Sequence, residues 1–96
     1  MAMLHTVVDS MMTAKFNVLH VHWVDSQAFP LVLPSAPKLS AGAWSPEQRY
    51  SLADIRELQE YAEARGIRVV AEIDTPGHGG SWCTGMPEIC PSTTCA

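Results

Sequence analysis

The first apolar residues of the chain recur every three or four positions, a spacing that places them on one face of a helix. This stripe consists of Leu4, Val7, Val8, Met11 and Met12. It predicts an amphipathic helix over residues 2–14. The stretch that follows, FNVLHVHWVD at residues 16–25, is β-branched, aromatic and almost continuously apolar. A run of this kind predicts a strand covered on both faces, as in a parallel sheet.

A second helix and a second strand are predicted in the latter half of the chain. Ser51 and Asp54 have the spacing of a capping box ahead of an apolar stripe, which predicts a helix over residues 51–65. Gly66 suits the left-handed position that often ends a helix. The next residues, IRVVAEID at 67–74, repeat the pattern of a buried strand.

The two remaining stretches are predicted to be loops. Residues 26–50 contain four prolines, which exclude a long helix there. Residues 75–96 are rich in glycine, proline, serine and threonine. A connection as long as 26–50 is unusual unless it has a function.

The order helix, strand, loop, helix, strand, loop predicts an α/β fold with parallel strands joined by a right-handed crossover. Two strands do not form a stable parallel sheet alone. We therefore expect residues 1–96 to be a fragment of a larger fold, a partial TIM (β/α)8 barrel comprising about two strands and two helices. Complete barrels of this kind have about 250 residues.

Composition excludes some classes of partner. The formal net charge is −4 and the pI is about 5.4, so we expect no nucleic-acid partner, because phosphates bind basic surfaces. No apolar run reaches the roughly 20 residues of a membrane span. The first residues, MAMLHTVVDS, lack the basic and apolar regions of a signal peptide.

The three cysteines lie close to one end of the sequence, at positions 83, 90 and 95. Because the count is odd, at least one is free or pairs outside this chain. Their spacing does not suggest zinc. Two interpretations stay open, ordinary cysteines in an irregular tail or a disulfide to a segment outside the sequence.

Polar residues follow both predicted strands, and sites in parallel α/β folds lie where strands end. Asp25 ends the first strand and His78 lies just beyond the second. Since neighbouring strands are about 4.8 Å apart, an Asp25–His78 hydrogen bond is geometrically reasonable and would fix the imidazole tautomer. The alternative is that Asp25 caps a loop while His78 faces solvent.

Other residues near these strand ends have competing interpretations. Glu72 and Asp74 share a strand face about 6–7 Å apart, near the spacing of paired glycosidase carboxylates, although a buried ion pair is the commoner use of Glu72. Trp44 could line a pocket or simply anchor the long loop. His20 and His22 form an H-x-H pair that supplies metal ligands in amidohydrolase barrels. A non-catalytic glycan-binding role, based on Trp44 and Trp82, is a further alternative.

Three stretches resemble the catalytic barrel of family 20 β-N-acetylhexosaminidases. They are KFNVLHVHWVDSQAFP, YSLADIRELQEYAEARGIRVVAEIDTPGH and SW. The family pattern reads K-x-N-x-h-H-W-H-h-x-D-D-Q-S-F-P, where h is apolar, followed by Y-T-x-x-D, R-G-I-x-V, E-[FI]-D-x-P-G-H and S-W-G. The similarity runs from about Val8 to Cys95 in the same order and spacing.

The resemblance implies hydrolysis of terminal non-reducing N-acetylglucosamine or N-acetylgalactosamine from glycoconjugates or chitin oligomers. Catalysis in the family retains the anomeric configuration, because the substrate's own 2-acetamido oxygen attacks the anomeric carbon. No metal or organic cofactor is implied. The parent enzyme would be lysosomal, vacuolar or secreted, with a glycan substrate, no membrane span and, in some members, a dimeric state.

The catalytic machinery is carried over only in part. The family's Asp-Glu pair lies in an H-x-G-G-D-E motif, which is absent from this sequence, so the 96 residues alone are expected to be inactive. Asp25 and His78 match residues that support the catalytic Glu. Substrate-binding residues cannot be assigned. Cys95 matches a disulfide cysteine of eukaryotic members. The departures from the family pattern are Val21, Trp23, Ser26, Ala28 and Cys83.

Overall fold

Residues 1–90 are described by a computed structural model of the chain. The chain divides into two compact units. The first comprises Met1–Val21 with Leu52–Ala71, and the second comprises His22–Ser51 with Glu72–Ala96. Both predicted strands cross from the first unit into the second near their carboxyl ends.

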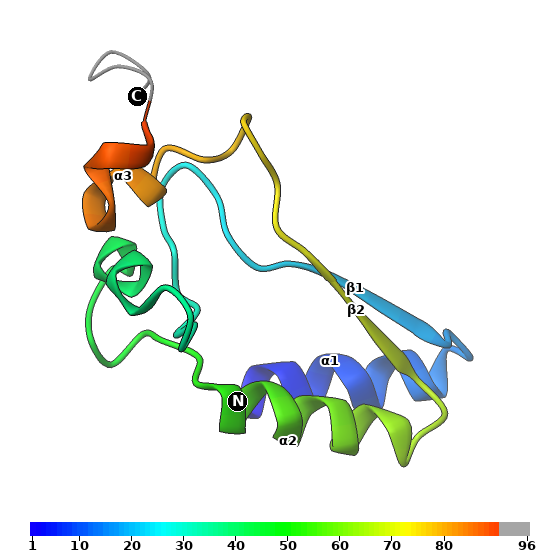
Figure 1. Ribbon diagram of the computed structural model, residues 1–96. Helices are drawn as coiled ribbons and strands as arrows, with labels where there is room; N and C mark the ends of the chain where they lie inside the picture. Colours follow the sequence, from blue (N-terminus) through cyan, green and yellow to red (C-terminus); the bar gives the residue numbers. More distant parts are fainter. Residues whose placement is uncertain (91–96) are drawn as a thin grey trace. The chain divides into compact units, whose positions relative to one another are not determined.

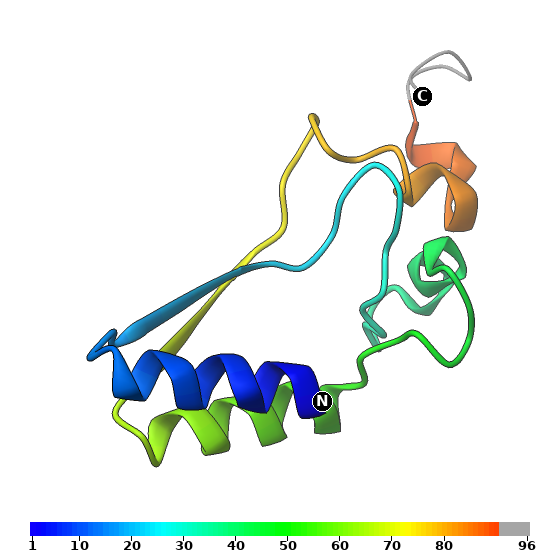
Figure 2. The same ribbon diagram turned by 180° about the vertical axis from the view of Figure 1, so that it is seen from behind.

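Two helices and two strands build the first unit. Helices α1 (Ala2–Thr13) and α2 (Leu52–Glu63) pack side by side (Figures 1 and 2). Strands β1 (Val18–His22) and β2 (Arg68–Glu72) form a two-stranded sheet. The apolar core of the unit consists of Val8, Leu58, Ala62 and Ile67. The predicted helices and strands are thus confirmed, although each is shorter than expected.

The strands run parallel, as the order of their flanking hydrogen bonds shows. The Arg68 amide donates to the Asn17 carbonyl over 2.9 Å, and the Trp23 amide donates to the Glu72 carbonyl over 3.1 Å. Pairing therefore advances in the same direction along both strands. The fold class is a small α/β arrangement with two parallel strands.

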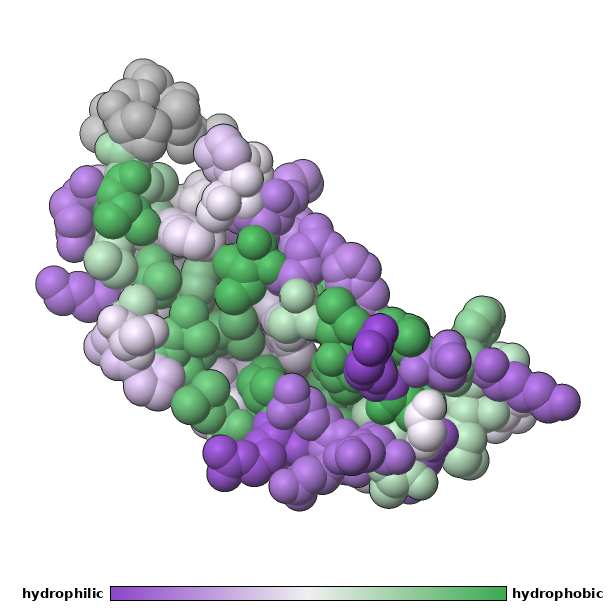
Figure 3. Space-filling model, turned by 45° about the vertical axis from the view of Figure 1, so that its right-hand side comes forward, coloured by the Kyte–Doolittle hydropathy of each residue, from purple (hydrophilic) through white to green (hydrophobic). Residues whose placement is uncertain are grey.

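The expectation that the strands are covered on both faces is wrong for this chain. Exposure alternates along β1, and Val18 and Val70 remain 42% and 36% exposed. The physical reason is that α1 and α2 lie on the same side of the strand pair (Figures 1 and 2), and the first unit contains no further helix for the other face. Figure 3 shows apolar side chains at the surface among polar ones.

Both helices of the first unit end in a left-handed residue. Gly66 has φ of 73°, its amide donates to the Glu63 carbonyl, and the Ile67 amide donates to the Ala62 carbonyl. This pair of bonds is a Schellman motif, which confirms Gly66 as the predicted cap. Helix α1 ends in the same way, but with Lys15 in the left-handed position at φ 63°.

The second unit is more ordered than the two predicted loops suggested. Within 26–50 lies the 3-10 helix η1 (Pro37–Gly42), and within 75–96 lie α3 (Trp82–Gly85) and the 3-10 helix η2 (Pro87–Ile89). Helix α3 packs on η1. The contact requires glycine, because a Cβ at Gly85 would collide with the Lys38 carbonyl oxygen. The unit's apolar core consists of Trp23, Val24, Phe29, Leu31 and Leu39.

A disulfide between Cys83 and Cys90 links α3 to the residue that follows η2. Both interpretations offered for these two cysteines were therefore wrong, since they pair with each other within the chain. Their spacing of seven residues gave no hint, because α3 and η2 were not predicted. Cys95 lies outside the described residues. None of the helices in the described part of the chain has the length and apolar character needed to cross a membrane.

Candidate functional site

Asp25 follows β1 by three residues and is fixed through its backbone. Its amide donates to the Ala28 carbonyl over 3.0 Å, and its carbonyl accepts a hydrogen bond from the Ser81 hydroxyl. Ser81 is only 3% exposed. The buried side chain of Ser81, which follows β2, therefore holds the turn that follows β1 and contains Asp25. The sequence analysis did not identify this role of Ser81.

His78 stands in a turn after β2 that begins with a cis Thr75–Pro76 peptide bond. Its own φ is 59°, in the left-handed region. This conformation costs a residue with a Cβ roughly 1–2 kcal/mol. Residues held in such conformations are frequent at functional sites, where the surroundings impose them.

The predicted hydrogen bond between Asp25 and His78 is present. His78 Nδ1 lies 2.9 Å from Asp25 Oδ1, and the Ser26 amide donates to the same oxygen over 2.6 Å. These two hydrogen bonds lower the pKa of Asp25, with the His78 bond as the larger cause. The same bond raises the pKa of His78, assisted by the negative charge of Asp25 and, more weakly, of Asp74 and Glu72.

His22 joins this pair from the end of β1. Its ring meets the His78 ring edge to face, with centroids 5.4 Å apart. Its Nδ1 atom lies 4.0 Å from Asp25 Oδ2, the oxygen that does not contact His78. The sequence interpretation considered His22 only as a partner of His20 in metal binding. The H-x-H-x-x-D spacing, which puts His22 three residues before Asp25, could have indicated this contact.

Glu72 and Asp74 face His22. One imidazole nitrogen of His22 and one carboxylate oxygen each of Glu72 and Asp74 lie within 4.8 Å of one another. The two carboxylates are therefore closer together than the roughly 6–7 Å expected from the strand spacing. Both carboxylates are half-buried, and Glu72 has an interaction partner. The cluster at the two strand ends therefore contains three carboxylates and two imidazoles.

Comparison with known proteins identifies the family. The family described as "Glycosyl hydrolase family 20, catalytic domain" matches residues 1–95. The chain belongs to glycoside hydrolase family 20. It is 56% identical over 89 residues to Beta-hexosaminidase 3 of Arabidopsis thaliana, which covers 93% of this chain and 17% of that protein. It is 47% identical over 83 residues to Beta-hexosaminidase subunit beta of Mus musculus, covering 85% of this chain and 16% of that protein.

Solved structures agree with this assignment. Flavobacterium johnsoniae chitobiase superposes with a TM-score of 0.81 at 40% identity, over 90% of this chain and 13% of that one. Streptomyces plicatus N-acetyl-beta-hexosaminidase in complex with Thio-NAglucal superposes with a TM-score of 0.83 at 29% identity, over 92% and 19%. The chain thus spans less than a fifth of the length of each relative and structure named here.

Membership of family 20 sets aside the amidohydrolase alternative, and the structure agrees on one point. His20, the first histidine of the H-x-H pair, belongs to neither group of possible metal ligands among the described residues. His22 belongs to both. His20 and His22, which were expected to bind a metal together, therefore do not share a group of possible ligands. The reason is that His22 is the last residue of β1 and His20 lies two residues before it.

The tryptophans of this family 20 chain have different environments. Trp44 is 75% exposed, so it does not anchor the long loop as one interpretation proposed. Trp82 packs edge to face on the buried Phe29, with ring centroids 5.6 Å apart. Trp82 also borders a hollow of about 300 Å³. The other residues lining this hollow are Thr75, Pro76, Gly79, Gly80, Cys83, Ile89 and Cys90.

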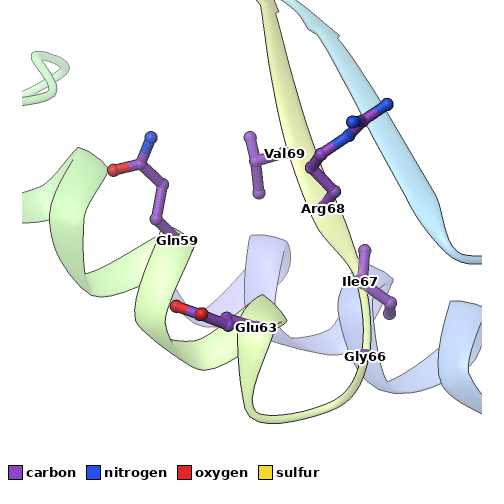
Figure 4. Close-up of a pocket in the computed structure, with 6 residues that line it drawn as sticks. All are labelled: Gln59, Glu63, Gly66, Ile67, Arg68 and Val69. Carbon is purple, nitrogen blue, oxygen red and sulfur yellow. The ribbon is translucent and has the colours of Figure 1, made fainter.

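A second hollow, of about 500 Å³, lies in the first unit between α2 and the start of β2 (Figure 4). Gln59 and Glu63 border it from the helix, and Arg68 and Val69 from the strand. It contains none of the predicted site residues. This hollow lies at the amino end of β2, whereas the active sites of barrel enzymes lie at the carboxyl ends of the strands. We therefore do not expect it to be part of an active site.

Proposed function

We propose that this chain is part of the catalytic barrel of a β-N-acetylhexosaminidase. In that enzyme the two strands would be neighbours in a (β/α)8 barrel. Its substrates would be glycans ending in N-acetylglucosamine or N-acetylgalactosamine. Support comes from the relatives named beta-hexosaminidases and from the family 20 structures, including one in complex with Thio-NAglucal.

The observation that carries this proposal is the Asp25–His78 hydrogen bond at the carboxyl ends of two parallel strands. Asp25 accepts from Nδ1 and thereby fixes the imidazole orientation. The other nitrogen, Nε2, is then available to a third group. When the imidazole is protonated, Nε2 donates, and its natural acceptor is the carboxylate of a catalytic acid.

In the proposed reaction, the substrate's 2-acetamido oxygen attacks the anomeric carbon. A Glu supplied by the rest of the enzyme protonates the leaving oxygen and later activates water. Asp25 and His78 are positioning residues in this scheme. They act by orienting the Glu and adjusting its charge.

The Cys83–Cys90 disulfide further supports an oxidising compartment for the enzyme, such as the secretory pathway.

The test is a chimera in which these residues replace the matching segment of Arabidopsis thaliana Beta-hexosaminidase 3. We expect the chimera to hydrolyse a chromogenic N-acetylglucosaminide, whereas the 96-residue chain alone should not. Asp25→Asn and His78→Gln should each lower kcat on the order of 10–100-fold, as loss of an orienting partner does elsewhere.

The matched control is His5→Gln on α1, which lies in the other unit and should keep full activity. Full kcat in the Asp25→Asn and His78→Gln chimeras would refute the positioning role. Turnover by the isolated chain would refute the need for an external acid.

Glycan binding without turnover is a second candidate, favoured by the 75% exposure of Trp44. An exposed indole offers an apolar face on which a sugar ring can stack. Titration of the isolated chain with N-acetylglucosamine oligomers, with and without Trp44→Ala, tests it. Binding that disappears in the variant would support this role.

A further inference from the structure

The cluster at the strand ends has a composition that hydrolysis of a glycosidic bond does not require. Its members are His22, Asp25, Glu72, Asp74 and His78. They form two overlapping groups in which one nitrogen or oxygen atom per residue lies within 4.8 Å of the others. One group is His22, Asp25 and His78, and the other is His22, Glu72 and Asp74.

Imidazole nitrogens and carboxylate oxygens are the ligands that zinc accepts, at about 2.0–2.2 Å. Two imidazoles in one cluster favour Zn²⁺ over Mg²⁺ or Ca²⁺, which prefer oxygen ligands. The three carboxylates add negative charge, which attracts a cation. A group of acidic residues alone would lack this selectivity.

The distances permit coordination after small side-chain movements. In a tetrahedral zinc site, neighbouring ligand atoms are about 3.3 Å apart, whereas His22 Nδ1 and Asp25 Oδ2 are 4.0 Å apart. These two side chains are 34% and 45% exposed. Rotation about their side-chain bonds can therefore close the gap without moving the hydrogen-bonded backbone of Asp25.

We propose that His22, Asp25 and His78 bind one Zn²⁺, and that this ion inhibits the enzyme. A metal-bound imidazole nitrogen carries no proton to donate. Zinc on Nδ1 would break the Asp25 bond, and zinc on Nε2 would occupy the atom that faces the catalytic acid. Zinc binding does not depend on the proposed hexosaminidase function, whereas inhibition by zinc rests on that function.

His20 provides a matched control, because it lies on the same strand two residues earlier and outside both groups. Zinc binding to the 96-residue chain is measured by calorimetric titration with zinc chloride. Cys95 is replaced by serine so that its thiol does not compete. His22→Gln should weaken binding at least tenfold, whereas His20→Gln should leave it unchanged, and magnesium chloride should give no binding.

The chimera supplies the second measurement and decides the matter if the isolated chain shows no cooperative folding. Zinc should inhibit its turnover, and His22→Gln should raise the inhibitory concentration at least tenfold relative to His20→Gln. Equal effects of the two variants, or no zinc binding by either protein, would overturn the proposal. Zinc binding by the chain together with an inactive chimera would retain the metal site and reject the hexosaminidase function.

Discussion

His78 Nδ1 lies 2.9 Å from Asp25 Oδ1, although 53 positions of sequence separate the two residues. The contact exists because each residue follows one of two adjacent parallel strands. It joins a turn fixed by Ser81 to a histidine in the left-handed region. The pKa values of the two groups move in opposite directions, which keeps Asp25 ionised and favours protonated His78.

The first prediction concerns pH. Since the pKa of His78 is raised, the contribution of His78 to stability is complete below about 6.5 and is lost as pH rises through its folded-state pKa. Since the pKa of Asp25 is lowered, its contribution is present above about 3.9 and is lost as pH falls through its folded-state pKa. The pair is therefore most stabilising in weakly acidic solution.

If protonated His78 assists the catalytic acid, Asp25→Asn should move the basic limb of the kcat/KM profile of the chimera to lower pH. The reason is that the variant replaces the carboxylate with a neutral amide, so the negative charge is lost and the hydrogen bond that raises the His78 pKa is weakened. Asp9→Asn, in the first unit, is the matched control and should leave the profile in place. An unshifted profile in Asp25→Asn would contradict the assignment.

The second prediction separates the backbone of His78 from its side chain. Both His78→Ala and His78→Gly remove the imidazole and should reduce turnover of the chimera alike. Glycine accepts φ of 59° freely, whereas alanine does not. The glycine variant should therefore be more stable by about 1 kcal/mol, which is about 2–4 °C in the midpoint of thermal inactivation. Equal midpoints would show that the backbone relaxes.

Much of this arrangement follows from local patterns in the sequence. The stripe from Leu4 to Met12 predicted α1, and Gly66 predicted the end of α2, because both depend on neighbours within a few residues. The Asp25–His78 bond was predictable because parallel strands bring their carboxyl ends together. The exposure of Val18 and Val70 was not predictable, because it depends on which face of the strand pair the helices cover and not on the pattern of the strands themselves.

The second unit resisted prediction for a different reason. Helix α3 and η1 are short, and their contact depends on close backbone approach at Gly42 and Gly85 rather than on a periodic apolar stripe. The Cys83–Cys90 pairing depends on α3 itself. His22 was misassigned because the H-x-H pattern suggested a shared role with His20. The structure shows that it contacts Asp25, which the three-residue spacing could have indicated, and His78, which the spacing could not.

The third prediction concerns the end of α1. Lys15 has φ of 63° at the position where α2 has Gly66. Lys15→Gly should stabilise the chimera by about 0.5–1 kcal/mol, because glycine occupies this region without the steric cost of a Cβ. Ala14→Gly is the matched control. Ala14 has φ of −80°, so glycine there should destabilise by about as much, through its greater chain entropy. Thermal inactivation of both variants measures the difference, and a loss of stability in Lys15→Gly would contradict it.

The fourth prediction tests the packing of α3 on η1. A Cβ at Gly85 would lie well inside van der Waals contact with the Lys38 carbonyl oxygen and close to the Leu39 backbone, neither of which is a flexible side-chain end. Gly85→Ala should therefore destabilise by about 1–3 kcal/mol, as overpacking does.

Gly77→Ala is the control, because nothing lies within 4 Å of the Cβ it would add. Both chimeras are compared by thermal inactivation and by kcat. If α3 holds Ser81 against Asp25, Gly85→Ala should also lower kcat while Gly77→Ala does not. A stable and active Gly85→Ala chimera would mean that the α3–η1 contact is looser than the structure shows, and that Asp25 is held in place without it.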